Sequence, residues 1–112
     1  MSIKPESLGL QVVTTPGTPQ PISSVATNGT CKQWTITPTK ALPGTANVGN
    51  IYIGTSTMSK STGAGVYRVL TPTTLPVTFS KPESSGEFFK LNEWFVDADN
   101  GTDGFLVGFF GQ

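Results

Sequence analysis

The stretch of sequence that decides the fold is NIYIG at residues 50–54, together with NEWFVD at residues 92–97 and GFLVGFF at residues 104–110. All three are too short to form a stable helix on their own. They combine β-branched and aromatic side chains, which suit the pleated surface of a strand, and glycine, asparagine or aspartate bounds each of them. We interpret these stretches as interior strands of a small all-β domain.

The composition of the whole chain agrees with such a domain. Its 112 residues suffice for one domain, and only 12% of them are charged, against about 25% in an ordinary globular protein. The 13 Gly and 9 Pro residues divide the chain into short segments. Such punctuation predicts an antiparallel β-sandwich of about eight short strands, which we assign to residues 21–112.

Residues 1–20 are expected to form an extended or flexible N-terminal arm. Apolar residues are sparse there, and prolines at positions 16, 19 and 21 interrupt regular strand pairing. Two interpretations stay open, a disordered leader or an arm that lies along a neighbouring subunit. Residues 10–14 could instead form a first strand.

Alternation along the predicted strands identifies the side chains that face the core. In QWTIT at residues 33–37, tryptophan and isoleucine share one face and polar residues the other. In LPVTFS at residues 75–80, Leu75, Val77 and Phe79 are expected to point inward, while Pro76, which has no N–H to donate, predicts a sheet edge. The predicted core consists of Trp34, Ile36, Ile51, Ile53, Val77, Phe79, Trp94, Val96, Phe105 and Val107.

The closing strand is apolar on both of its faces. Leu106 and Phe110 point away from the predicted core residues of that strand, and Phe95 does the same on the strand before it. A second apolar face must be covered, either within the domain or by another chain. We expect the partner interface to contain Val12, Val13, Phe95, Leu106 and Phe110.

The chain lacks the residues of the commonest catalytic and metal sites. It has no histidine, which excludes Ser-His-Asp and Cys-His catalysis together with the commonest zinc ligand. The single cysteine, Cys31, cannot form an intrachain disulfide and is interpreted as a small buried apolar residue. The carboxylates of residues 83–103 lie mostly at predicted turns, where we expect a solvated rim. No catalytic residue, metal or cofactor is therefore assigned.

The octet DADNGTDG at residues 97–104 has two interpretations. Calcium prefers several oxygen ligands from a short loop, and this octet offers four side-chain candidates. It departs from the EF-hand pattern, because Gly101 stands at the fifth ligand position and no glutamate stands at the twelfth. Asn100 and Gly101 between two strands also make an ordinary hairpin turn, which is the interpretation we prefer.

Charge and hydropathy exclude two further classes of partner. The formal net charge is zero and the charged residues are spread singly, so the chain lacks the basic stripe that nucleic-acid binding requires. No apolar run approaches the roughly 20 residues of a membrane-spanning helix. Residues 1–10 also lack the basic start and apolar block of a signal peptide.

One ordered set of motifs points to a known class of protein. NIYIG at residues 50–54 is followed by a Ser/Thr-rich loop, by LPVTF at residues 75–79, by LNEWFVDA at residues 91–98, and by a Gly-Thr-Asp turn before the closing strand. In this order the half of the chain from residue 47 to residue 108 resembles small β-structured virion proteins of tailed bacteriophages. Residues 71–74, TPTT, stand where those proteins usually have Pro-Gly, and residues 1–46 have no counterpart.

This resemblance implies a jelly-roll-like sandwich, assembly as a homotrimer and a location in the virion after synthesis in the host cytoplasm. The partner it implies is the major capsid protein or another virion protein. We therefore expect a non-enzymatic structural protein that decorates or cements a phage capsid through apolar subunit contacts. The alternative is a tail-fibre or baseplate domain, or a carbohydrate-binding module in which Trp34, Tyr52 and Tyr67 stack on sugars.

Overall fold

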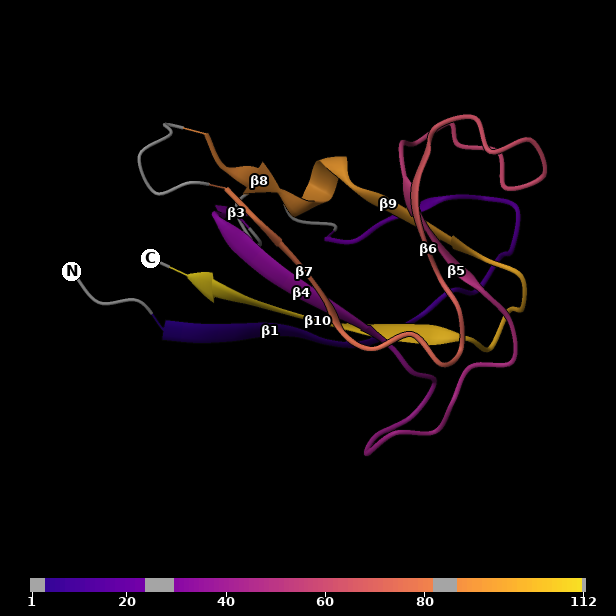
Figure 1. The fold of residues 1–112 in the computed structure, drawn as a ribbon, viewed down its shortest axis with the longest axis horizontal. Helices are drawn as coiled ribbons and strands as arrows, with labels where there is room; N and C mark the ends of the chain where they lie inside the picture. The colour runs from indigo at the N-terminus through magenta and orange to yellow at the C-terminus, as the bar shows by residue number, and fades with distance from the viewer. Residues whose placement is uncertain (1–3, 24–29, 82–86, 112) are drawn as a thin grey trace.

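The computed structural model describes residues 4–23, 30–81 and 87–111, and nearly all regular structure in them is β (Figure 1). Two four-stranded antiparallel sheets form the body. The first contains, in spatial order, β1 (Lys4–Val12), β10 (Gly104–Gly111), β4 (Gln33–Pro38) and β7 (Val77–Ser80). The second contains β2 (Gln20–Pro21), β9 (Phe95–Ala98), β5 (Ile51–Gly54) and β6 (Val66–Leu70).

Two smaller elements complete the described structure. β3 (Thr30–Cys31) pairs with β8 (Phe89–Lys90), and a single 3-10 turn, η1 (Leu91–Glu93), leads from β8 into β9. Among the described residues, no helix has the length and apolar character that a membrane crossing requires.

The strand order of the two large sheets is that of a jelly roll. With the β3–β8 pair left aside, the first strand pairs with the last (β1–β10), the second with the second from last (β2–β9), then β4 with β7 and β5 with β6. These pairs fall alternately in the first and the second sheet. A long antiparallel ribbon rolled up in this way is a double Greek key. The predicted all-β antiparallel sandwich of jelly-roll type is confirmed.

The core lies between the two sheets. Of the ten predicted core residues, eight are buried in one apolar cluster, and Val77 and Trp94 pack against that cluster while partly exposed. Trp34 stacks on Phe79 with 4.7 Å between ring centroids and meets the edge of Trp94 at 5.5 Å. Such ring pairs contribute roughly 0.5–1.5 kcal/mol each beyond the area they bury. These rings form an aromatic centre within the apolar core.

The N-terminal segment differs from the expected arm. Lys4–Val12 is β1, and it pairs with β10 of the same chain from Lys4 opposite Gly111 to Val12 opposite Gly104, with a bulge between Ser7 and Gly9. The prolines that suggested an arm come later, where the chain crosses to the second sheet. Because β1 is an edge strand of the first sheet, its proline, Pro5, costs no hydrogen bond inside the sheet. The strand forms because it covers an edge of the apolar strand β10.

The segment before β7 also differs from the prediction in part. β7 is an edge strand, as Pro76 indicated, but it begins only at Val77. Residues 71–74 form a turn in which the Thr74 N–H donates to the Thr71 carbonyl at 3.0 Å. Leu75 therefore lies outside the strand, and its side chain is 80% exposed instead of pointing inward.

Candidate functional site

The first sheet presents one of its two surfaces to solvent. On β10, Phe105 and Val107 are fully buried, so Leu106 between them must point to the opposite side of the sheet. The paired strands follow the same alternation, because residues directly opposite each other share a face. We call this surface the outer face. Its described residues are Ser7, Leu10, Val12, Gln33, Thr35, Thr37, Thr78, Ser80, Leu106 and Gly108.

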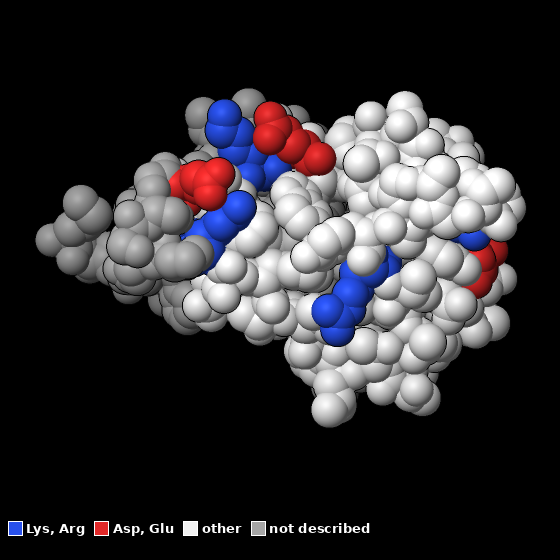
Figure 2. Space-filling view, turned by 45° about the horizontal axis from the view of Figure 1, so that its top comes forward, with Lys and Arg blue, Asp and Glu red and all other residues white. Residues whose placement is uncertain are grey.

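The outer face carries no charge among its described residues. Leu10 and Val12 are 38% and 37% exposed, and Leu10 stands opposite Leu106 in the ladder. Beside them, the hydroxyls of Thr35 and Thr78 share a hydrogen bond of 3.0 Å across β4 and β7. Figure 2, a view turned by 45° from that of Figure 1, shows basic and acidic groups next to one another in several places and uncharged residues over most of the visible described surface. An uncharged sheet face with an apolar row is the kind of surface that another protein chain covers.

The five predicted interface residues do not form one patch. Val12 and Leu106 lie on the outer face, and Leu10 joins them there. Val13 is fully buried in the core, because alternation turns it inward, so it is not available to a partner. Phe95 is half-buried on β9 of the second sheet, opposite Pro21 and Gly54.

Phe110, the fifth predicted interface residue, can be placed only by its backbone, which pairs with Pro5; its side chain lies outside the described part. Leu10, which the sequence analysis did not place on this face, had a signal. Leu8, Leu10 and Val12 alternate with polar or small residues, which is the pattern of a strand.

Two aspartates, one near the end of β9 and one in the turn before β10, hold other segments of the chain. Asp103 is fully buried, and its two oxygens accept hydrogen bonds from the backbone N–H groups of Val48 at 2.8 Å and Gly49 at 2.7 Å. Asp97, 1% exposed, accepts from the N–H groups of Gly17 at 2.9 Å and Ala98 at 2.8 Å. These two aspartates therefore hold two loops, one at Gly17 and one at Val48 and Gly49, instead of forming part of a solvated rim.

Asp99, which lies in the same turn as Asp103, is exposed and points elsewhere. It accepts from the Asn50 N–H and the Tyr52 hydroxyl, both at 3.2 Å, and it lies 3.9 Å from the Lys60 ammonium. Nowhere in the described ranges do three or more acidic, cysteine or histidine side chains gather as a metal site would need. The aspartates of the turn thus point to different partners, as backbone-capping groups do.

Cys31 has the environment of a structural cysteine. Its side chain is 1% exposed, and burial raises the pKa of the thiol to about 11 from an ordinary value of 9.0, against a smaller lowering effect of a backbone hydrogen bond from Gln33. A protonated buried thiol is a poor nucleophile.

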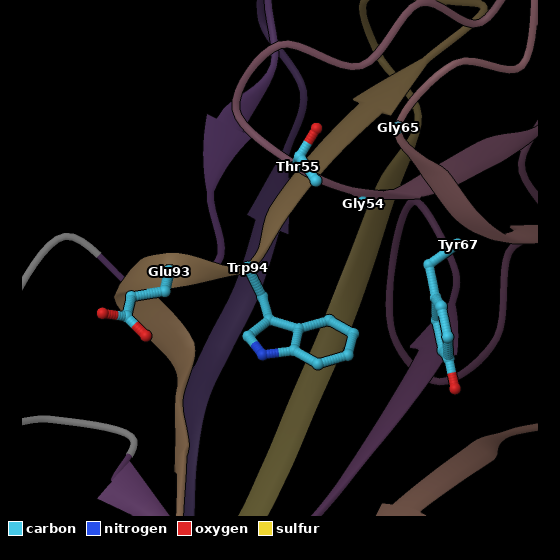
Figure 3. Close-up of a pocket in the computed structure, with 6 residues that line it drawn as sticks. All are labelled: Gly54, Thr55, Gly65, Tyr67, Glu93 and Trp94. Carbon is cyan, nitrogen blue, oxygen red and sulfur yellow. The ribbon is translucent and has the colours of Figure 1, made fainter.

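A pocket opens on the second sheet beside the aromatic centre. It has a volume of about 190 Å³ and is lined by Gly54, Thr55, Gly65, Tyr67, Glu93 and Trp94 (Figure 3). Tyr67, 66% exposed, stands perpendicular to Trp94 with 5.5 Å between ring centroids. The β5–β6 bulge shapes the rim, and the Thr55 N–H donates to the Gly65 carbonyl across it at 3.0 Å.

This pocket changes the set of aromatic residues that could stack on a sugar. Trp34 is fully buried, so it is not available. Tyr52 is half-buried and donates its hydroxyl to Asp99. Of the three residues first considered, only Tyr67 lines the pocket, and Trp94, which was assigned to the core, lines it as well.

Comparison with known proteins found no matching family model, no similar curated protein and no similar solved structure.

Proposed function

We propose that this protein is a non-enzymatic structural component of a virion, which decorates or cements the capsid of a tailed bacteriophage. Its partner would be the major capsid protein or another virion protein. The single observation that carries the proposal is the uncharged outer face with its row of Leu10, Val12 and Leu106. The jelly roll also supports it, since this fold serves in viral capsid domains, although the same fold serves lectins and cupins.

The energetics of the outer face favour attachment in many copies over attachment of one. Complete burial of a leucine or valine side chain is worth about 1.5–3 kcal/mol, and these three are already more than half covered. Docking the row therefore contributes about 2 kcal/mol, less than the 4–15 kcal/mol that association costs. The remaining binding free energy must come from residues at the rim of the contact and from the simultaneous attachment of several linked copies.

Symmetry supplies that linking. A trimer attached to a capsid engages three equivalent sites at once, and later contacts are intramolecular once the first has formed. The proposed homotrimer would bury about 800 Å² per subunit in a contact of standard size, which is roughly an eighth of the 6174 Å² accessible surface of the chain.

The test compares two matched substitutions, Val12→Lys and Val69→Lys. Both valines lie on edge strands and are similarly exposed, 37% and 43%, but Val12 is on the outer face and Val69 is on the second sheet. Particles of the phage that encodes the chain, depleted of it, are incubated with each variant, and bound copies are counted by quantitative mass spectrometry. We expect Val12→Lys to lose most binding and Val69→Lys to bind like the unsubstituted protein.

Two outcomes contradict this proposal. One is equal binding by the two variants, which would remove the outer face from the contact. The other is an unsubstituted protein that is monomeric by light scattering and does not bind the depleted particles at all. Copy number adds a further measurement, since hundreds of copies per virion indicate a shell protein and a handful indicate a tail or vertex.

A further inference from the structure

Trp94 offers a rigid aromatic surface at the pocket on the second sheet. Besides its perpendicular contact with Tyr67, its ring packs against Trp34 at 5.5 Å, Phe79 at 5.7 Å and Phe89 at 5.7 Å. A ring fixed on several sides loses little conformational entropy when a ligand covers its remaining surface. The aromatic wall of the pocket is therefore in place before any ligand arrives.

The polar side-chain groups of the lining have no partner among the described residues. In the described part of the chain, the Glu93 carboxylate, the Thr55 hydroxyl and the Tyr67 hydroxyl have no hydrogen bond or ion pair with another residue. The Tyr52 hydroxyl, by contrast, donates to Asp99. An apolar aromatic wall edged by free hydrogen-bonding groups is the usual composition of a small-molecule site.

The size and layout of the pocket restrict the ligand. Its volume of about 190 Å³ is below the roughly 300–1,000 Å³ of pockets for drug-sized molecules, so it accommodates one small ring. Figure 3 shows the Glu93 carboxylate and the Tyr67 ring on opposite sides of the Trp94 indole. A ligand that satisfies both must have an apolar face and polar groups around its edge.

We propose that this pocket binds a single neutral hexopyranose unit, such as the terminal sugar of a glycan. The C–H face of the sugar packs on the Trp94 indole beside the Tyr67 ring. Its hydroxyls face the rim of the pocket, and the side chains of Glu93 and Thr55, whose polar ends point away from the indole in Figure 3, turn toward them on binding. A quaternary ammonium, the other ligand of aromatic pockets, requires the rings and the carboxylate to converge on one point, and these do not. The inference is independent of capsid attachment.

The two tryptophans of the chain provide the assay. Each indole N–H gives one peak in a proton–nitrogen correlation spectrum; Trp34 is fully buried and Trp94 lines the pocket. The ¹⁵N-labelled protein is titrated to high millimolar concentrations with the methyl glycosides of glucose, galactose, mannose and N-acetylglucosamine, and separately with choline chloride. We expect at least one glycoside to shift the Trp94 peak saturably while the Trp34 peak stays in place.

Exposed side chains make the variants, because Trp94→Ala would also disturb the core. Tyr67→Ala should weaken the glycoside about tenfold, and Glu93→Gln should weaken it by roughly fivefold through loss of a charged acceptor. Phe88→Ala removes another exposed ring, 42% accessible and outside the pocket, and should leave the affinity unchanged.

Each opposite result overturns the inference. These results are a Trp94 peak that no glycoside moves, equal movement of both indole peaks, saturation by choline without saturation by any glycoside, or unchanged affinity in Tyr67→Ala.

Discussion

Replacement of Asp103 tests whether the β9–β10 turn holds the loops around it. The Asp103 carboxylate is fully buried and accepts two short hydrogen bonds, from the Val48 N–H at 2.8 Å and the Gly49 N–H at 2.7 Å. Asp103→Asn preserves the volume and one acceptor oxygen but loses the charge and the second acceptor. Asp103→Ala loses both acceptors and leaves two backbone donors without a partner.

The magnitude follows from the number of bonds lost. A hydrogen bond to a charged group contributes about 1.5–3 kcal/mol, and a donor that water can still reach costs less than one that is sealed. Because Val48 is itself 67% exposed, we use the lower end of this range. We therefore expect the free energy of unfolding to fall by about 1.5 kcal/mol in Asp103→Asn and by about 3 kcal/mol in Asp103→Ala.

The assay is urea unfolding at neutral pH, with the slope of free energy against urea compared among variants, so that a changed unfolded state is recognised. Asp99→Asn is the matched control, because Asp99 belongs to the same turn but is exposed and makes longer contacts of 3.2 Å. Its effect should stay within about 0.5 kcal/mol. If Asp103→Asn is as stable as Asp99→Asn, the carboxylate does not hold the loop and this reasoning is refuted.

Two further predictions concern the backbone and the thiol. A Cβ added at Gly54 would stand 2.0 Å from the Gly65 carbonyl oxygen, whereas one at Gly44 would meet nothing within 4 Å. Gly54→Ala should therefore lower the free energy of unfolding, measured in urea, by about 1–3 kcal/mol, and Gly44→Ala should leave it almost unchanged. Equal stability of the two variants would contradict the close approach at the β5–β6 bulge. The Cys31 pKa is about 11 in the fold against 9.0 ordinarily, so the unfolded chain loses this proton first as pH rises. Stability from this group is complete below pH 9 and is lost towards pH 11, by about 2–3 kcal/mol, and Cys31→Ala should lack that part of the decline. An identical decline in the two proteins would show that the thiol is not responsible.

The fold was predictable because its central strands carry their own signal. β4, β5, β9 and β10 alternate apolar and polar residues, or are apolar on both sides, and nearly every residue predicted for the core is in it. β1 was harder to predict, because it has few apolar residues and its stability depends on the edge of β10, 92 or more positions away in its ladder. Only the folded structure shows that β10 has an edge left for β1 to pair with.

The candidate sites were less predictable, for a similar reason. Asp97 and Asp103 look like surface residues in sequence, since carboxylates are seldom fully buried, and their burial depends on loops that supply backbone donors. The aromatic pocket brings together a bulge at Gly54 and a turn residue, Glu93. These residues are far apart in the sequence, and no local sequence pattern predicts that they meet. Leu10, however, had a strand pattern that the later prolines obscured.

The two proposed sites lie on different sheets, and this arrangement has a consequence for the assembled particle. The outer face belongs to β1, β10, β4 and β7, whereas the pocket is lined by residues of β5, of β6 and of the loop next to them, and by Glu93 and Trp94 just before β9. A copy that docks through the outer face therefore leaves the pocket open to solvent. Saturating glycoside should not alter the number of copies bound per particle, and a decorated particle should hold a multivalent glycan surface far more tightly than one free copy does. Release of bound copies by the free glycoside would contradict the separation of the two sites, because it requires the same surface to serve both partners.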